Sequence, residues 1–340
     1  MVQQWVMVKG SGGGGLGDRL RAVLVGIAYA RACGRGISVD WRDDVYAERG
    51  DNAFEHLFQI VGLSYSPPQY LECSASVFPP AWSGRLHKSM HAAYVEDGHP
   101  PWNRTEAIHR YSFDVTQHNH EQDVLVMWDF DQLPKLLGDR FFNPNLLASD
   151  EFVAQVARQF IRPSRKIETQ LDRLLPPSEA VRIGVHVRET HEGVAQKGSI
   201  PLAAYWAVLD RWRQREKRWE IVLATDNSEV LSRFKERYGA VIAHDKWFAT
   251  PGASIHLNPS CPDKLQAAED AALELSALAR CNYLLVRQNS SFGMIAKWLS
   301  GLSSDHVCEL SPSGRTLVQR IWSGCGMTFQ LPRLIRGNNS

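Results

Sequence analysis

The chain has 340 residues, of which 44% are hydrophobic and 22% are charged, a balance that excludes a mainly disordered protein. Its length exceeds the usual limit of a single hydrophobic core and predicts two domains. The 38 Lys and Arg residues are matched by 37 Asp and Glu. This balance gives no basic field for nucleic acid or an anionic membrane, and no apolar run reaches the roughly 20 residues of a membrane span.

The start of the chain, MVQQWVMVKG, lacks the basic and apolar regions of a secretory signal. The six cysteines are widely spaced and form no CxxC pair, which is more typical of a reducing compartment than of a disulfide scaffold. We therefore expect a cytoplasmic protein without an integral membrane segment.

The first half opens with a βαβ pattern. An apolar strand at 5–8 runs into the glycine-rich turn KGSGGGGLGD at 9–18, and apolar residues then recur at helical spacing from Leu20 to Ile27. A second strand follows at 37–41. The region 64–120 is rich in Pro, Ser, His and aromatic residues without a sustained period, so it predicts loops and short elements. A buried strand at 123–130 and helices at about 150–160 and 164–175 complete this half.

The second half alternates strands and helices more regularly. Strands are predicted at 181–187, 219–225, 240–244 and 282–288, and helices at 201–216, 228–239, 262–280 and 291–302. Apolar strands alternating with helices predict a parallel sheet covered on both faces. We expect an α/β fold of two doubly wound, Rossmann-like domains facing each other across a cleft, joined near the PPSE stretch at 176–179.

The glycine-rich turn leaves three interpretations open. Gly10, Gly12 and Gly15 fit the G-x-G-x-x-G pattern, and Asp40 at the end of the next strand could bind a ribose, as in NAD(P)-dependent oxidoreductases or epimerases. Glycine-rich runs satisfy such patterns by chance, however. The turn could instead bring backbone close to a sugar or phosphate at the helix N-terminus near Asp18, or be a plain turn.

Polar residues follow three strands of the second half. One strand ends in His186 and Arg188, and another in Asp226; a third is followed by Arg287, Gln288, Asn289, Ser290 and Ser291. In open α/β sheets, ligands bind beyond the carboxyl ends of the strands. Arginine matches phosphate oxygens, and serines that open a helix suit an anion. The pattern predicts one site for a nucleoside diphosphate.

Two further groups favour structural roles. His118, His120 and Glu121 lack partnering cysteines and are more typical of surface polarity than of a metal site, so no metal is expected. Trp82, Tyr94 and Trp102 could stack on sugar rings, but packing is the simpler prediction.

Five stretches resemble the bacterial nodulation fucosyltransferases and, more distantly, the core α-1,6-fucosyltransferases of glycosyltransferase family 23. They lie at 15–42 (GLGDRL…ISVDWR), 125–128 (LVMW), 183–188 (IGVHVR), 223–231 (LATDNSEVL) and 274–291 (ELSALARCNYLLVRQNSS). The resemblance implies a GT-B fold. It implies an acceptor-side domain over 1–177, a nucleotide-sugar domain over 178–310, and a segment over 311–340 that packs back on the first domain.

The same resemblance implies an inverting, metal-independent transfer of L-fucose from GDP-fucose to a hydroxyl of a glycan or protein, with α-1,6 linkage as one option. His186 and Glu274 would hold guanosine, Arg188 would bind the β-phosphate, and Asp226 would line the same edge. Ser290, with Asn289 and Ser291, would bind the phosphates. The remaining implied donor residues, across the cleft, are Gly15, Gly17 and Asp18.

The chain departs from the family at three positions. Glu274 stands where the family has Asp, and Glu189 stands where a second basic residue follows the arginine. Gln196 replaces a glutamate proposed as the base in the core enzymes, and a glutamine cannot accept a proton at neutral pH. The candidate bases are therefore Glu189, His191 and Glu192. A carbohydrate-binding module without catalysis is a third interpretation beside the transferase and the oxidoreductase.

Overall fold

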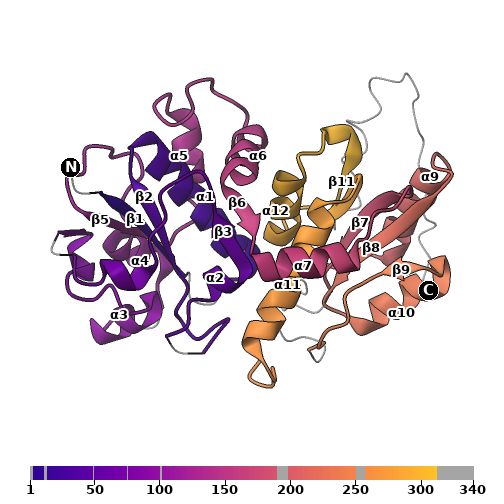
Figure 1. Ribbon diagram of the computed structural model, residues 1–340, viewed down its shortest axis with the longest axis horizontal. Coiled ribbons are helices and arrows are strands. Elements are labelled where there is room, and N and C mark those ends of the chain that lie inside the picture. Colours follow the sequence, from indigo (N-terminus) through magenta and orange to yellow (C-terminus); the bar gives the residue numbers. More distant parts are fainter. Residues whose placement is uncertain are drawn as a thin grey trace, which may run out of the picture.

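The computed structural model describes residues 3–10, 14–48, 50–74, 76–99, 102–189, 198–249 and 257–311 (Figure 1). These residues form two parallel sheets, one in each half of the chain. Helices α11 and α12 lie between them, in the middle of the molecule (Figure 1).

The first sheet has four parallel strands in the order β2-β1-β5-β4. Their bounds are β1 Trp5–Lys9, β2 Gly36–Asp40, β4 Val77–Phe78 and β5 Val124–Met127. Helix α1, Leu16–Ala32, crosses from β1 to β2 and is buried along nearly its whole length. The predicted opening βαβ unit is confirmed.

The second sheet has five parallel strands in the order β11-β10-β7-β8-β9. The strands are β7 Val181–Val187, β8 Trp219–Thr225, β9 Val241–Ile242, β10 Tyr283–Arg287 and β11 Val307–Leu310. The crossing helices are α9 Leu202–Arg213, α10 Ser228–Tyr238, α11 Lys264–Ala279 and α12 Ser291–Ser300. The bounds of β7 and β8 agree with the prediction, whereas β11 was not predicted. The three strands with polar ends, β10, β7 and β8, are adjacent.

Short elements fill the rest of the first half, and those within 64–120 agree with the prediction for that region. They are α2 Ala53–Leu57, β3 Phe58–Ile60, the 3₁₀ turns η1 Pro68–Leu71 and η2 Pro80–Trp82, α3 Met90–Glu96, α4 Arg104–Tyr111 and α5 Leu133–Gly138. Two longer helices follow, α6 Ser149–Phe160 and α7 Arg165–Leu174, separated by β6 Ile161–Pro163, which pairs antiparallel with β3. A last 3₁₀ turn, η4, spans Ser304–His306.

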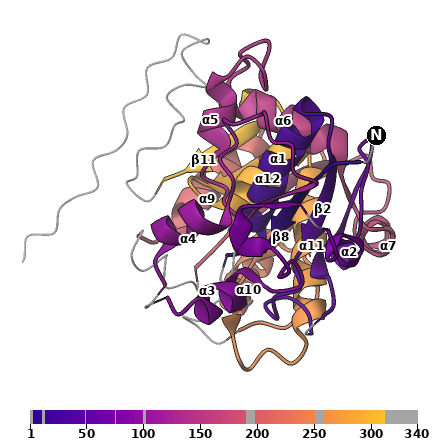
Figure 2. The ribbon, with the colours of Figure 1, turned by 90° about the vertical axis from the view of Figure 1, so that its left-hand side faces the viewer.

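The two halves pack closely against each other. Helix α12 contacts α1 and α6, and α11 contacts α7; Figure 2 shows α1 beside α12. One buried apolar cluster contains Val8 of β1 and Ala224 of β8, so it extends from one sheet to the other. Lys297 of α12 bonds Asp150 of α6 at 2.6 Å. The shared core holds the N-terminus of α1 against the carboxyl edge of the second sheet. The domain boundaries at 177/178 and 310/311 stay predictions, and residues 312–340 lie outside the described residues.

Candidate functional site

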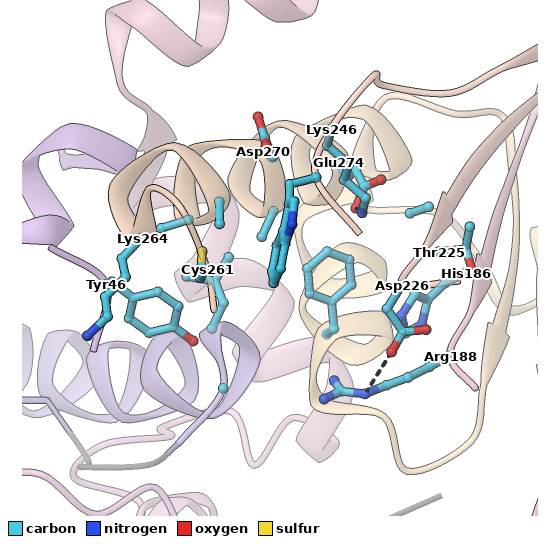
Figure 3. Close-up of a pocket in the computed structure, with 18 residues that line it drawn as sticks. Tyr46, His186, Arg188, Thr225, Asp226, Lys246, Cys261, Lys264, Asp270 and Glu274 are labelled. Carbon is cyan, nitrogen blue, oxygen red and sulfur yellow. Dashed lines mark hydrogen bonds and ion pairs between the residues drawn. The ribbon is translucent and has the colours of Figure 1, made fainter. Parts of the chain in front are cut away.

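A pocket opens between the two sheets, where the carboxyl ends of β7 and β8 face the N-terminus of α1 (Figure 3). One wall is the face of α11 that carries Asp270 and Glu274. The lining residues are Gly15, Leu16, Tyr46, His186, Arg188, Ala224, Thr225, Asp226, Lys246, Trp247, Cys261, Lys264, Ala267, Ala268, Asp270, Ala271, Glu274 and Phe292.

His186 is a neutral, buried imidazole at the base of the pocket. Its ring stacks on Phe292, with centroids 5.0 Å apart. Burial, together with the positive charge of Arg188, lowers the pKa of His186 to about 3. No described residue bonds its buried Nδ1 atom. The neutral ring lines the pocket, where it can offer a polar ligand a donor or an acceptor according to which nitrogen carries the proton.

Arg188 and Asp226 form an ion pair across the two strand ends. Arg188 Nε lies 3.9 Å from Asp226 Oδ2, the contact dashed in Figure 3. The other carboxylate oxygen of Asp226 accepts a hydrogen bond of 3.1 Å from the backbone N–H of Glu189. Burial, and then the charge of Asp226, raises the pKa of the Glu189 carboxyl. Asp226 therefore orients a cation and shifts a carboxylate toward the range useful for accepting a proton.

A second ion pair lies farther along the pocket. Lys246 Nζ donates to Glu274 Oε2 at 2.6 Å, and burial raises the pKa of Glu274. One turn earlier on α11, Asp270 bonds His244 at 2.8 Å. Lys264, at the start of the helix, donates to the backbone oxygen of Asp44 at 2.8 Å, linking α11 to the first half.

The N-termini of α1 and α12 meet beside the pocket. A Cβ added to Gly17 would lie 2.5 Å from the backbone nitrogen of Phe292, so only glycine allows this approach. Ser290 caps α12 by accepting from the N–H of Gly293, and Asn289 just before it has a left-handed φ of 59°. The positive ends of two helices thus face one region, which favours an anion there.

Five of the predicted site residues line the pocket: Gly15, His186, Arg188, Asp226 and Glu274. Another five lie at the two adjoining helix N-termini but are not among the lining residues: Gly17, Asp18, Asn289, Ser290 and Ser291. Glu189 directly follows Arg188 but is not among the lining residues, and His191, Glu192 and Gln196 lie outside the described residues.

Several lining residues were not predicted, among them Tyr46, Lys246, Trp247, Lys264 and Phe292. Asp270, also missed, was within reach of sequence reasoning, because it lies four residues before Glu274 on the same helix face. Lys246 had no comparable signal, since it lies outside any regular element.

The ribose contact considered for Asp40 is wrong. The carboxylate is buried, with Lys9 Nζ at 2.6 Å from Oδ2 and Arg42 Nε at 2.8 Å from Oδ1. Both oxygens are bound within the first sheet, so Asp40 offers no free group for NAD. Gly12 of the proposed fingerprint lies outside the described residues.

The other polar and aromatic candidates lie outside the pocket. Trp82 and Tyr94 are buried, whereas Trp102 is 44% exposed. His118 stacks on Phe141 at 4.5 Å, and His120 lies 4.9 Å from the ring of Phe78. Within the described ranges, no three His, Cys, Asp or Glu side chains form a group that could hold a metal ion. No helix in the same ranges has the length and apolar character to cross a membrane.

Comparison with known proteins gives a match in structure rather than in sequence. No family model matches the chain. No curated protein matches it either. A crystal structure of NodZ α-1,6-fucosyltransferase soaked with GDP-fucose superposes with a TM-score of 0.61 at 20% identity, covering 92% of this chain and 96% of that one. A selenomethionine structure of fucosyltransferase NodZ from Bradyrhizobium gives the same TM-score and identity, covering 92% and 97%.

A third structure, a mutant of Arabidopsis thaliana FUT1 in complex with GDP, matches with a TM-score of 0.54 at 15% identity, covering 91% of this chain and 70% of that one. At these identities the likeness concerns the fold. The predicted α/β architecture with two parallel sheets, of the GT-B type, is confirmed, and the chain is similar in fold to NodZ over nearly its whole length.

Proposed function

We propose that the protein is a fucosyltransferase that moves L-fucose from GDP-fucose to a hydroxyl group of a glycan or protein acceptor. One observation carries the proposal: the pocket with Arg188 lies at the carboxyl ends of β7 and β8, in a fold shared with NodZ, which has been crystallised with GDP and soaked with GDP-fucose. We assign the donor to residues 178–310 and the acceptor to residues 1–177, on the opposite side of the pocket.

The donor's diphosphate would lie at Arg188 and the N-terminus of α12. The guanidinium of Arg188 is held by Asp226, and its remaining N–H groups are suited to phosphate oxygens. Ser290, Asn289 and Ser291 surround the start of α12, and Gly15, Gly17 and Asp18 surround that of α1. His186 and Glu274 would bind the guanosine.

The reaction would be a single displacement with inversion. The acceptor oxygen forms a bond to C1 of fucose while the bond from C1 to the β-phosphate oxygen breaks, and GDP leaves with the electron pair. Arg188 would stabilise the charge that develops on GDP. Donors aimed at such charge contribute roughly 2.7–4 kcal/mol each. Because Arg188 supplies positive charge at this point, we propose transfer without a metal.

The proton of the acceptor hydroxyl would pass to a base on the segment after β7. Glu189, His191 and Glu192 are the candidates. Glu189 is supported by its raised pKa and by its position next to Arg188. We also propose a cytoplasmic location, which the unpaired state of the described cysteines favours.

The first experiment is a thermal-shift panel in EDTA with GDP-fucose, GDP-mannose, GDP, UDP-glucose, NAD⁺ and NADPH. A ligand at about 100 times its Kd stabilises the folded protein by about 2.7 kcal/mol, which raises Tm by a few degrees. Stabilisation by GDP and GDP-fucose, with none from NAD⁺, is the expected result. A response to NAD⁺ alone would overturn the proposal.

The second experiment measures transfer itself. GDP-fucose labelled in the sugar is incubated with chitooligosaccharides, N-glycans and protein acceptors, in EDTA and in Mg²⁺. The expected result is a fucosylated product whose anomeric configuration, read by NMR, is inverted relative to the donor and whose rate is unchanged by EDTA. Retention of configuration would exclude the single displacement, and loss of activity in EDTA would exclude the metal-independent step.

A further inference from the structure

Lys246 and Glu274 form a buried ion pair whose side chains both line the pocket. The two side chains are 5% and 9% exposed, and their charged atoms lie 2.6 Å apart. They lie together at the upper edge of the lining side chains, between Asp270 and Thr225 and away from Arg188 (Figure 3). Lys246 comes from the segment after β9 and Glu274 from the middle of α11.

Stability does not account for this pair. Removing two charges from water costs several kcal/mol per ion, so an apolar pair of similar volume is often as stable. The pair is also incompletely satisfied. An ammonium has three N–H donors, and the only hydrogen bond of Lys246 to a described residue is to Glu274. No described residue donates to the second carboxylate oxygen of Glu274. The unused donors and the unused oxygen are available to a ligand in the pocket.

The neighbouring wall suits a flat ring. Ala267 and Ala271 lie on the pocket face of α11 next to Glu274, and their short side chains leave room along the helix. Asp270 on the same face accepts from His244 and Gln266, which both bond its Oδ1 at 2.8 Å. Glu274 is the carboxylate on this wall that lies beside an ammonium, that of Lys246.

We propose that Lys246 selects guanine by donating a hydrogen bond to its O6 atom, while Glu274 accepts from N1–H and the 2-amino group. This inference rests on the proposed function, and it assigns Lys246 a role in specificity. Guanine presents an acceptor beside two donors, the complement of an ammonium beside a carboxylate. Adenine presents an amino group at position 6 and a lone pair at N1. In the same orientation the amino donor would face the ammonium of Lys246, and the N1 lone pair would face the carboxylate of Glu274.

Uracil has an O4 atom and an N3–H group in the same order as guanine, but its O2 atom would face the carboxylate of Glu274. The pair thus distinguishes guanine from adenine at two positions and from uracil at one.

The test changes one hydrogen-bonding atom of the nucleotide at a time and asks which protein side chain makes the protein sensitive to that change. Kd values for GDP, 6-thio-GDP, IDP and ADP are measured by calorimetry in EDTA. 6-Thio-GDP keeps N1–H but replaces O6 by sulfur, a weak acceptor, and IDP lacks only the 2-amino group. The wild type is expected to bind GDP about tenfold or more tightly than 6-thio-GDP and IDP, since hydrogen bonds to charged groups are the stronger ones.

Lys246→Met is expected to bring the ratio of the 6-thio-GDP and GDP Kd values close to one. Glu274→Gln is expected to reduce the ratio for IDP instead. Lys166→Met is the matched control: Lys166 pairs with Glu269 on the same helix α11 at 2.6 Å but is 57% exposed and outside the pocket. Its two ratios should equal those of the wild type.

Should Lys246→Met not fold, the double variant Lys246→Met/Glu274→Leu replaces the pair by apolar side chains and should likewise lose both preferences. A Lys246→Met protein that keeps the wild-type preference for GDP over 6-thio-GDP overturns the inference, as does a wild type that binds ADP as tightly as GDP. If the wild type binds no nucleoside diphosphate at all, the proposed function itself fails, an outcome distinct from both.

Discussion

Nε of Arg188 and Oδ2 of Asp226 lie 3.9 Å apart because the parallel register of β7 and β8 pairs Val187 with Thr225, one residue earlier on each strand. The sheet therefore positions the pair, since each residue directly follows the last residue of its strand. Both side chains leave the sheet at its carboxyl edge, where they line the pocket. This arrangement leads to the first two predictions.

Arg188→Ala should lower kcat/KM for transfer by about 10²–10³ or more, because the developing charge on the leaving diphosphate loses a donor. Initial rates with labelled GDP-fucose measure this, and circular dichroism should show an unchanged fold. Arg218→Ala is the control, since Arg218 is 73% exposed and pairs only with the exposed Glu179 among the described residues. A variant at Arg188 with near wild-type activity would contradict the phosphate assignment.

Asp226→Asn should shift the pH profile of kcat/KM. Burial and the charge of Asp226 both raise the pKa of Glu189, so removing that charge lowers it. If Glu189 is the base, activity persists to lower pH, and the acidic limb moves down in pH. The measurement is kcat/KM from pH 4.5 to 8 in both proteins. An unmoved limb would exclude Glu189 and leave His191 and Glu192 as candidates.

Gly17→Ala should destabilise the protein by about 1–3 kcal/mol, because the added Cβ meets the backbone of Ser291 and Phe292 at 2.5 Å and neither helix end can move alone. It should also weaken stabilisation by GDP, since the start of α12 is displaced. Urea unfolding with and without GDP measures both effects. Gly138→Ala, at the end of α5 with nothing within 4 Å of the new Cβ, should not lower the stability and should leave the response to GDP unchanged. Equal behaviour of the two variants would argue against the tight contact.

His186→Gln should flatten the acid dependence of stability. The folded protein holds His186 neutral to about pH 3, whereas in the unfolded chain the ring takes up a proton near pH 6.5. Because the unfolded state binds more protons, the wild-type free energy of unfolding decreases as the pH falls from about 6.5 toward 3. Urea unfolding at pH 7.5 and 5 compares the slopes. A variant at His186 that keeps the wild-type slope would show that the ring does not titrate this way.

Local patterns were sufficient for much of the fold. The apolar runs at 181–187 and 219–225 are strands with those bounds, because a strand buried on both faces is apolar throughout. Ligands bind at the carboxyl ends of strands in such sheets, and on that basis His186, Arg188 and Asp226 were predicted to share one site. All three line the pocket. Some short elements escaped prediction, among them β11 with four residues and β3 and β6 with three each.

The sequence by itself thus determined the α/β class, the alternation of elements and the strand ends at which a ligand would bind, since each follows from local periodicity and composition. Only the tertiary structure decided which charges meet. Asp40 on β2 is bound by Lys9 on the neighbouring strand β1. This contact excludes the ribose-binding role that the position of Asp40 in the sequence had suggested. Lys246 became a candidate for reading guanine because folding brings it to Glu274, 28 residues away. Such pairings depend on strand order, register and helix packing, which bring distant segments together. The local pattern of apolar and polar residues in the sequence does not encode them.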